Sequence, residues 1–142
     1  MMSEHKVTND FSFGFSLGFS LIELMISLAI VSILTALVLP SYRQYIVRTN
    51  TVAAQQYLLE LVSLQNQTMF ENHGYTEKLE TLGVPPLERV KNHYDVAITN
   101  VSNTATPPTY SIQATPKFDS AQAKTSTLTI NHLGQKTGDW YE

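Results

Sequence analysis

One carboxylate stands out in this sequence because it lies inside an apolar segment. The stretch from Phe19 to Leu39 has 21 residues, and Glu23 is its only ionisable side chain. As a helix, a segment of this length crosses a bilayer core of about 30 Å. A charged group in hydrocarbon is costly and by default marks a functional site with a partner. We therefore expect a membrane helix whose glutamate is neutralised by another group.

The residues around this glutamate form a specific motif. The run Gly18-Phe19-Ser20-Leu21-Ile22-Glu23-Leu24 resembles the processing site of type IV prepilins and related pseudopilins. The resemblance implies that a prepilin peptidase cuts after Gly18 and that Phe19 becomes the N-methylated first residue. It also implies that Glu23, fifth from Phe19, acts in assembly and register. Pro40 matches a proline at which the helix of this family loosens when subunits assemble.

The resemblance also implies a partner for the carboxylate. After cleavage, the free amine of Phe19 can neutralise Glu23 within one chain, or between an incoming subunit and the subunit already at the filament base. Pairing between chains requires the correct axial height, so the pair would act mainly as a register device. The alternative is that Glu23 has no role in assembly and that its side chain simply extends to the polar interface of the membrane.

The segment before the motif is expected to be a leader peptide that is removed. In a secretory signal peptide the apolar part precedes the cut, whereas here it follows the proposed cut and is retained. A cut after Gly14 is an alternative, but it would place Phe19 rather than a carboxylate at the fifth position. The cut after Gly18 is therefore preferred.

The charges around the apolar segment conflict with this assignment. The leader carries Lys6 against Glu4 and Asp10, and Arg43 and Arg48 follow the apolar run. The positive-inside rule alone would place the C-terminal part in the cytoplasm. The prepilin motif is far more specific than two arginines, and it implies the opposite orientation.

The composition excludes several kinds of chemistry. Cysteine is absent, which removes disulfides, thiol nucleophiles and cysteine-based zinc sites. No phosphate loop or His-Glu-x-x-His motif occurs, and His73, His93 and His132 lack the spacing of metal ligands. The net charge of −3 gives no general reason for nucleic-acid binding. We expect a protein that is not an enzyme and that needs no cofactor or metal.

Helical periodicity continues beyond the apolar segment. Six side chains share one helical face: Tyr42, Ile46, Ala53, Tyr57, Leu61 and Leu64. This spacing predicts an amphipathic helix from about 41 to 70, with Asn50 and Gln55 off the apolar face. Gly74 is expected to end it at the C′ position, which favours a left-handed residue. The two segments form one helix with Pro40 inside, where proline costs about 3 kcal/mol and kinks or weakens the helix.

The rest of the chain predicts a loop followed by strands. Residues 74–92 lack sustained periodicity, whereas alternating apolar residues occur in three later runs: Tyr94 to Val101, Tyr110 to Ala114, and Leu128 to Ile130. A fourth short strand is expected at Trp140 and Tyr141. The sequence therefore predicts an α+β fold, in which a long N-terminal helix with transmembrane and amphipathic halves packs on a three- or four-stranded antiparallel sheet. The pilin fold has the same order of elements.

The C-terminal part resembles one pilin subgroup more closely. The runs Tyr110 to Pro116 and Ser126 to Trp140 look like the end of PilE-like minor pilins. In that subgroup a cysteine pair usually occupies the places held here by Ser126 and Asp139. Both cysteines are missing together, which fits the loss of the whole disulfide better than the loss of one of its two partners.

The resemblance implies a structural subunit of a type IV pilus, most like a minor pilin. Residues 1–18 are then the leader, 19–39 the transmembrane and filament-core helix, and 40–142 the globular head. The head is expected in the periplasm while the helix is in the inner membrane, and in the extracellular filament after assembly. The expected partners are other pilin subunits, the prepilin peptidase and methyltransferase, the inner membrane and the pilus assembly machinery.

Two alternative functions stay open. A major pilin or a type II secretion pseudopilin has the same sequence signature. A DNA-uptake receptor pilin needs a basic patch, which Lys117, Lys124 and Lys136 would supply. Three lysines are weak support for DNA binding, because a solvated sheet edge has the same composition.

Overall fold

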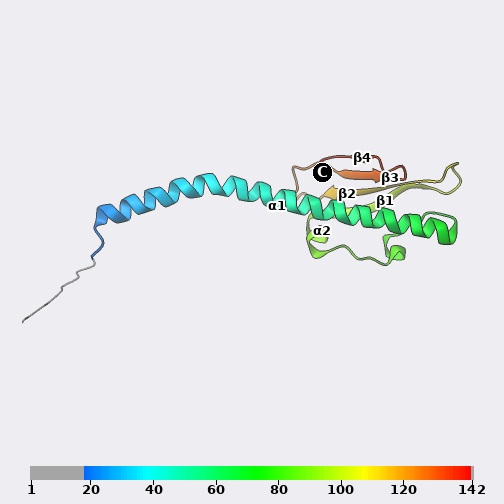
Figure 1. Cartoon of the computed structure of the whole chain (residues 1–142), viewed down its shortest axis with the longest axis horizontal. Coiled ribbons are helices and arrows are strands. Elements are labelled where there is room, and N and C mark those ends of the chain that lie inside the picture. Colours follow the sequence, from blue (N-terminus) through cyan, green and yellow to red (C-terminus); the bar gives the residue numbers. More distant parts are fainter. Residues whose placement is uncertain (1–17, 142) are drawn as a thin grey trace, which may run out of the picture. The chain divides into compact units, whose positions relative to one another are not determined.

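The computed structural model describes residues 18–141, so the expected leader lies outside the described residues except for Gly18. The chain forms two compact units with their boundary between Leu37 and Val38. One long helix, α1 (Leu21–Asn72), contributes residues to both units, and every other element belongs to the second, which we call the head unit (Figure 1). The prediction of a single long N-terminal helix is confirmed.

The first part of α1 is apolar, and three of its hydroxyl side chains are hydrogen-bonded within the helix. All residues from 18 to 45 are exposed, and the segment is long and apolar enough to cross a membrane. Its hydroxyl groups at Ser27, Ser32 and Thr35 each donate to a backbone carbonyl four residues earlier, at 2.7–2.8 Å. These internal bonds lower the cost of placing the hydroxyls in hydrocarbon or against other apolar helices.

Pro40 lies inside α1, which continues through it as helix. Because proline has no N–H, the carbonyl of Ala36 lacks its usual helical donor. The sequence prediction that proline stands in the interior of one long helix is confirmed. The helix therefore lacks one backbone hydrogen bond at the point where its apolar segment ends.

The head unit contains a four-stranded antiparallel sheet. Its strands are β1 (Tyr94–Ser102), β2 (Thr109–Pro116), β3 (Leu128–Asn131) and β4 (Lys136–Thr137). Each strand pairs with the next, in the order β1-β2-β3-β4 (Figure 1). The register aligns Ile98 with Ile112 and Ile112 with Ile130, which gives the sheet one apolar face. The predicted α+β fold with an antiparallel meander is confirmed.

The core forms where the second part of α1 packs on this face. Its buried apolar side chains come from both layers: Ala54, Tyr57, Leu58 and Leu61 of α1, and Tyr110, Ile112, Ala114, Leu128 and Ile130 of the sheet. The predicted helical face is right at Tyr57 and Leu61. It is wrong at Tyr42, whose side chain is 60% exposed, because the sheet does not extend beside the first turns after Pro40.

Polar residues of α1 are also buried, contrary to expectation. Asn50 and Gln55, predicted to lie off the packed face, are only 3% and 5% exposed. Gln55 Nε2 donates to the carbonyl of Asp139 at 3.2 Å. Gln65 donates to the carbonyl of Thr76 and accepts from its N–H, at 2.7 and 3.0 Å. Hydrogen bonds to distant backbone offset the burial of Gln55 and Gln65, whereas Asn50 Nδ2 has no hydrogen-bond partner among the described residues.

The end of α1 differs from the prediction. His73, not Gly74, adopts the left-handed conformation, with φ of 55°. An added Cβ at Gly74 would lie 3.2 Å from the Asn103 side chain, so that side chain would have to shift to accept it. That carboxamide accepts from the Tyr75 N–H and donates to the Tyr75 carbonyl, at 2.8 and 3.0 Å. The chain after α1 is thus held to the β1–β2 connection.

The segment predicted as a loop, residues 74–92, contains two short helices. These are η1 (Leu79–Leu82) and the start of α2 (Glu88–His93). Gly83 ends η1 with φ of 72°, and its N–H donates to the Glu80 carbonyl at 3.2 Å. Both helices are too short to show helical periodicity in the sequence.

The fourth strand is β4, not the Trp140 region. Lys136 and Thr137 pair with Ile130 and Thr129 of β3. The Trp140 indole N–H instead donates to the Thr137 carbonyl at 2.9 Å. The sheet therefore ends before Trp140, which is partly buried against the core.

Candidate functional sites

The proposed processing site precedes α1 in a non-helical segment. Gly18, Phe19 and Ser20 are exposed, with 72% of the Phe19 side chain accessible. Apart from its chain neighbours, no atom of the described residues would lie within 4 Å of a Cβ at Gly18, so packing among these residues does not require glycine there. The bond between Gly18 and Phe19 is thus open to another protein. The alternative cut after Gly14 lies outside the described residues.

Glu23 lies in the first turn of α1 and is exposed. The first helical hydrogen bond here runs from the Leu24 N–H to the Ser20 carbonyl at 3.2 Å. A carboxylate in the first turn is favoured by the helix dipole. Among residues 18–141, the two ion pairs involve other side chains. Glu23 therefore has no cationic partner within the described chain and is available to one from another source.

A buried polar network fixes the connection between β2 and β3 on α1. Gln122, fully buried, donates through Nε2 to the Val47 carbonyl at 3.0 Å. Its Oε1 accepts from the Tyr94 hydroxyl at 3.2 Å, and that hydroxyl lies 3.1 Å from Thr51 Oγ1. Because these groups satisfy one another, the connection has a defined position. Lys124 is held near α1 as a result.

This packing produces a groove with several cations. Its lining comes from α1, the β2–β3 connection and the C-terminal segment: Arg43, Gln44, Val47, Arg48, Lys124 and Tyr141. Its volume is about 640 Å³. The Arg48 guanidinium lies 5.1 Å from the centre of the Tyr141 ring, a cation–π contact. We call this feature the basic groove. Sequence analysis did not bring its two arginines together with Lys124.

The three lysines predicted to form a basic patch have different environments. Lys117 Nζ lies 3.4 Å from the Asp95 carboxylate and donates to the Lys91 carbonyl at 2.8 Å. Lys136 lies over the Trp140 ring, 4.9 Å from its centre. Lys124 lines the basic groove. The predicted patch is thus reduced, because the charge of Lys117 is partly compensated.

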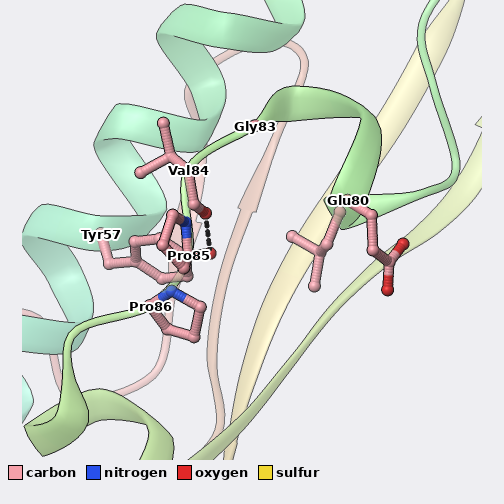
Figure 2. Close-up of a pocket in the computed structure, with 7 residues that line it drawn as sticks. Tyr57, Glu80, Gly83, Val84, Pro85 and Pro86 are labelled. Atoms are coloured by element: carbon pink, nitrogen blue, oxygen red, sulfur yellow. Dashed lines mark hydrogen bonds between the residues drawn. The ribbon is translucent and has the colours of Figure 1, made fainter.

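A second hollow lies between α1 and the segment after η1. Figure 2 shows Tyr57, Glu80 and the run Gly83 to Pro86 around it; Leu79 completes the lining, and the volume is about 410 Å³. The Tyr57 hydroxyl donates to the Val84 carbonyl at 2.9 Å. Burial and the nearby Glu60 charge raise the pKa of Tyr57, so its hydroxyl stays protonated. The hollow is mainly apolar.

Within the described part of the chain, no group of three or more histidine, aspartate and glutamate side chains could hold a metal ion. His93 and His132 each have an Nδ1 that is buried without a hydrogen-bond partner.

Two families match this sequence. The family described as type IV minor pilin ComP, DNA uptake sequence receptor, matches residues 40–129, well over half of the 142 residues. The prokaryotic N-terminal methylation motif matches residues 15–39. No curated protein matches the chain. The two matches adjoin at Pro40, where the apolar segment ends.

Proposed function

We propose a route of assembly for this chain on the premise that it belongs to the family of the type IV minor pilin ComP and is a structural subunit of a type IV pilus. The route has three steps: cleavage and methylation, storage in the membrane, and entry into the filament. No step requires catalysis by this chain.

The first step is cleavage between Gly18 and Phe19, followed by N-methylation of Phe19. The match of residues 15–39 to the methylation motif carries this proposal, and the exposed, non-helical Gly18-Phe19 segment supports it. A peptidase must approach the backbone closely, which favours a residue with no side chain before the cut. The leader, residues 1–18, is then lost.

The second step is storage of the subunit in the inner membrane. Residues 19–39 cross the bilayer, and residues 40–142 form a head on the periplasmic side. The length of the apolar segment supports the crossing. The prepilin-like order, with the apolar part retained after the cut, supports the orientation against the bias of the arginines that follow.

The third step is entry into the filament. The amine of Phe19 and the carboxylate of Glu23 pair between neighbouring subunits, which offsets the cost of a charge in an apolar filament core only in the correct register. The helix loosens around Pro40, where the Ala36 carbonyl already lacks a helical donor. Pilin subunits and the assembly machinery are the partners.

Mass spectrometry of sheared filaments tests this route. We expect an N-terminal peptide that begins with N-methylated Phe19, at low abundance relative to the principal subunit. Gly18→Ala is expected to be processed, whereas Gly18→Lys leaves an uncleaved chain in the membrane. A filament peptide that begins at Phe15, or an unprocessed chain in filaments, would contradict the route. An abundance equal to that of the principal subunit would indicate a major pilin.

A second function, binding of DNA, is favoured by the description of the matching family as a DNA uptake sequence receptor. Lys124 and the Lys136–Trp140 pair supply exposed cations and an aromatic ring in the head unit. We propose that Lys124 and Lys136 contact DNA phosphates. Such contacts release counterions, so affinity falls as salt rises.

Titration of a duplex oligonucleotide into the full chain in neutral detergent tests this function. We expect Kd to rise with salt, and Lys136→Gln to lower the salt slope by about one. Lys78→Gln is the control, because it removes the same charge from the segment before η1. Binding that is absent, or independent of salt, would contradict the proposal.

A further inference from the structure

The basic groove is lined by three cationic side chains, an arrangement that favours binding of an anion. Arg43, Arg48 and Lys124 line it together, and the described lining contains no carboxylate. Glu142, which follows Tyr141 in the chain, lies outside the described residues. Three cations around one hollow repel one another unless an anion neutralises them. Phosphate suits arginine in particular, because the planar guanidinium can donate two parallel hydrogen bonds to it.

The position of the groove along α1 indicates the source of this anion. Arg43 and Arg48 follow Leu39 by four and nine residues, or about 6 and 14 Å of helix at 1.5 Å per residue. The polar region outside the hydrocarbon core is roughly 5–8 Å thick on each side of a bilayer. Helical side chains generally tilt toward the helix N-terminus, which in α1 is the direction of the apolar segment.

The surroundings of the groove fit a membrane interface. A neighbouring hollow of about 420 Å³ shares Arg43 and Val47 with it and adds Tyr42, Ile46 and Ala121. Tyr42 and the nearby Tyr45 are 60% and 65% exposed. Tyrosines gather at the level of lipid headgroups, where one end of the ring is apolar and the hydroxyl is hydrated. The cations of the basic groove suit the phosphate of a phospholipid, and the neighbouring apolar hollow suits its glycerol and acyl chains.

We propose that the basic groove binds the headgroup of an anionic phospholipid in the membrane that stores the subunit. The proposal rests on the membrane storage step above and goes beyond it by naming a ligand. It explains why two arginines follow the apolar segment despite the positive-inside rule, because the groove uses them to hold the head unit at the membrane surface. Entry into the filament then requires release of the lipid.

Native mass spectrometry of the full chain in neutral detergent tests the groove directly. The probes are short-chain phosphatidylglycerol, phosphatidylcholine with the same acyl chains, and inorganic phosphate. We expect saturable binding of phosphatidylglycerol, at least tenfold tighter than that of phosphatidylcholine. Inorganic phosphate is expected to compete only at much higher concentration, because it lacks the glycerol and acyl contacts.

Variants assign the binding to the groove. Arg48→Gln with Lys124→Gln is expected to weaken phosphatidylglycerol binding at least tenfold, whereas Lys78→Gln with Lys91→Gln leaves it unchanged. Lys124→Ala alone, in an exposed connection, is expected to weaken binding severalfold and guards against a fold defect in the double variant. Fluorescence of Trp140, the only tryptophan and the neighbour of Tyr141, is expected to respond to lipid in wild type only.

Several results would overturn the proposal. They are equal binding of the two lipids, equal affinity for inorganic phosphate and phosphatidylglycerol, and binding unchanged in both groove variants. Displacement of the lipid by a duplex oligonucleotide at lower concentration than by phosphate would assign the groove to DNA instead. None of these measurements uses filaments, so failure of the lipid site and failure of the assembly route are observed separately.

Discussion

Ser126 and Asp139 hold two parts of the C-terminal segment together through a reciprocal pair of hydrogen bonds. The Ser126 N–H donates to Asp139 Oδ2 at 3.1 Å, and the Asp139 N–H donates to Ser126 Oγ at 2.9 Å. The resemblance to PilE-like minor pilins implies a cysteine pair at these two positions. The two hydrogen bonds lie where that disulfide would be. The Gln55 side chain also donates to the Asp139 carbonyl and so links this segment to α1.

Restoring the cysteines should therefore produce a disulfide. The two segments approach so closely that a Cβ at Gly138 would clash with the Thr127 carbonyl. For the double variant Ser126→Cys with Asp139→Cys, we expect the oxidised form to be about 3 kcal/mol more stable than the reduced form, as for a closed loop of about 15 residues. Denaturant unfolding of both forms measures this difference. Two free thiols after oxidation, detected by alkylation, would show that the segments do not meet.

The same contact predicts a dependence on acid. The hydrogen bonds from the Ser126 backbone and side chain lower the pKa of Asp139 below 3.8. A lowered pKa means that the contact stabilises the fold fully above pH 3.8, the ordinary pKa of the group. This stabilisation is lost as pH falls through the lower pKa that Asp139 has in the folded protein. We expect Asp139→Asn to lose less stability than wild type on acidification. Because Asp139 is exposed, the difference is expected to be small. Parallel acid denaturation curves for the two proteins would refute this.

Tyr110 predicts an effect in alkali. Its buried hydroxyl has no hydrogen-bond partner among the described residues, and burial followed by the nearby Tyr75 raises its pKa to about 12. A raised pKa means that the neutral Tyr110 hydroxyl contributes its full stability to the fold below pH 10, the ordinary pKa of tyrosine. This stability is lost as pH rises toward 12. We expect the stability of wild type to fall more steeply there than that of Tyr110→Phe.

At neutral pH, Tyr110→Phe is expected to change stability by less than about 1 kcal/mol, because it removes an unpaired group without opening a cavity. Thermal or denaturant unfolding measures the change. A loss of several kcal/mol would mean that the hydroxyl has a partner after all. Tyr57→Phe is the comparison variant, since the Tyr57 hydroxyl has a partner in the Val84 carbonyl and its loss should destabilise.

Pro40→Ala tests the role proposed for the interruption in α1. The substitution returns a donor to the Ala36 carbonyl and removes a steric clash, a gain of up to about 3 kcal/mol in helix stability. We expect slower hydrogen exchange at residues 36–42 in the detergent-solubilised subunit, and fewer or stiffer filaments. Ser41→Ala, the adjacent position, is the control. Unchanged exchange together with unchanged filament yield would count against a programmed weak point.

Glu23 is the residue on which assembly is expected to depend most. Glu23→Ala should yield a processed subunit that stays in the membrane, because an unpaired amine in the filament core is costly. Glu23→Asp and Glu23→Gln should incorporate better than alanine, since both keep a polar partner for the amine. Quantification of the subunit in sheared filaments and in membranes measures this. Equal incorporation of wild type and Glu23→Ala would end the register hypothesis.

The sequence by itself determined the features that depend on neighbouring residues. The apolar run with Glu23, the long helix through Pro40 and the three principal strands were predicted, because helical and strand periodicity is set within a few residues. The burial of Asn50 and Gln55 was missed for the opposite reason. The residues around Asn50 and Gln55 come from segments far along the chain. Helical periodicity alone predicts that a polar amide side chain lies on the surface.

Only the tertiary structure decided which distant residues meet. It brought Ser126 against Asp139, and it placed Lys124 beside Arg43 and Arg48 through the burial of Gln122. Such contacts depend on how the β2–β3 connection and the C-terminal segment pack on α1, and packing is cooperative across the whole head unit. A local pattern in the sequence therefore carries no signal for the basic groove.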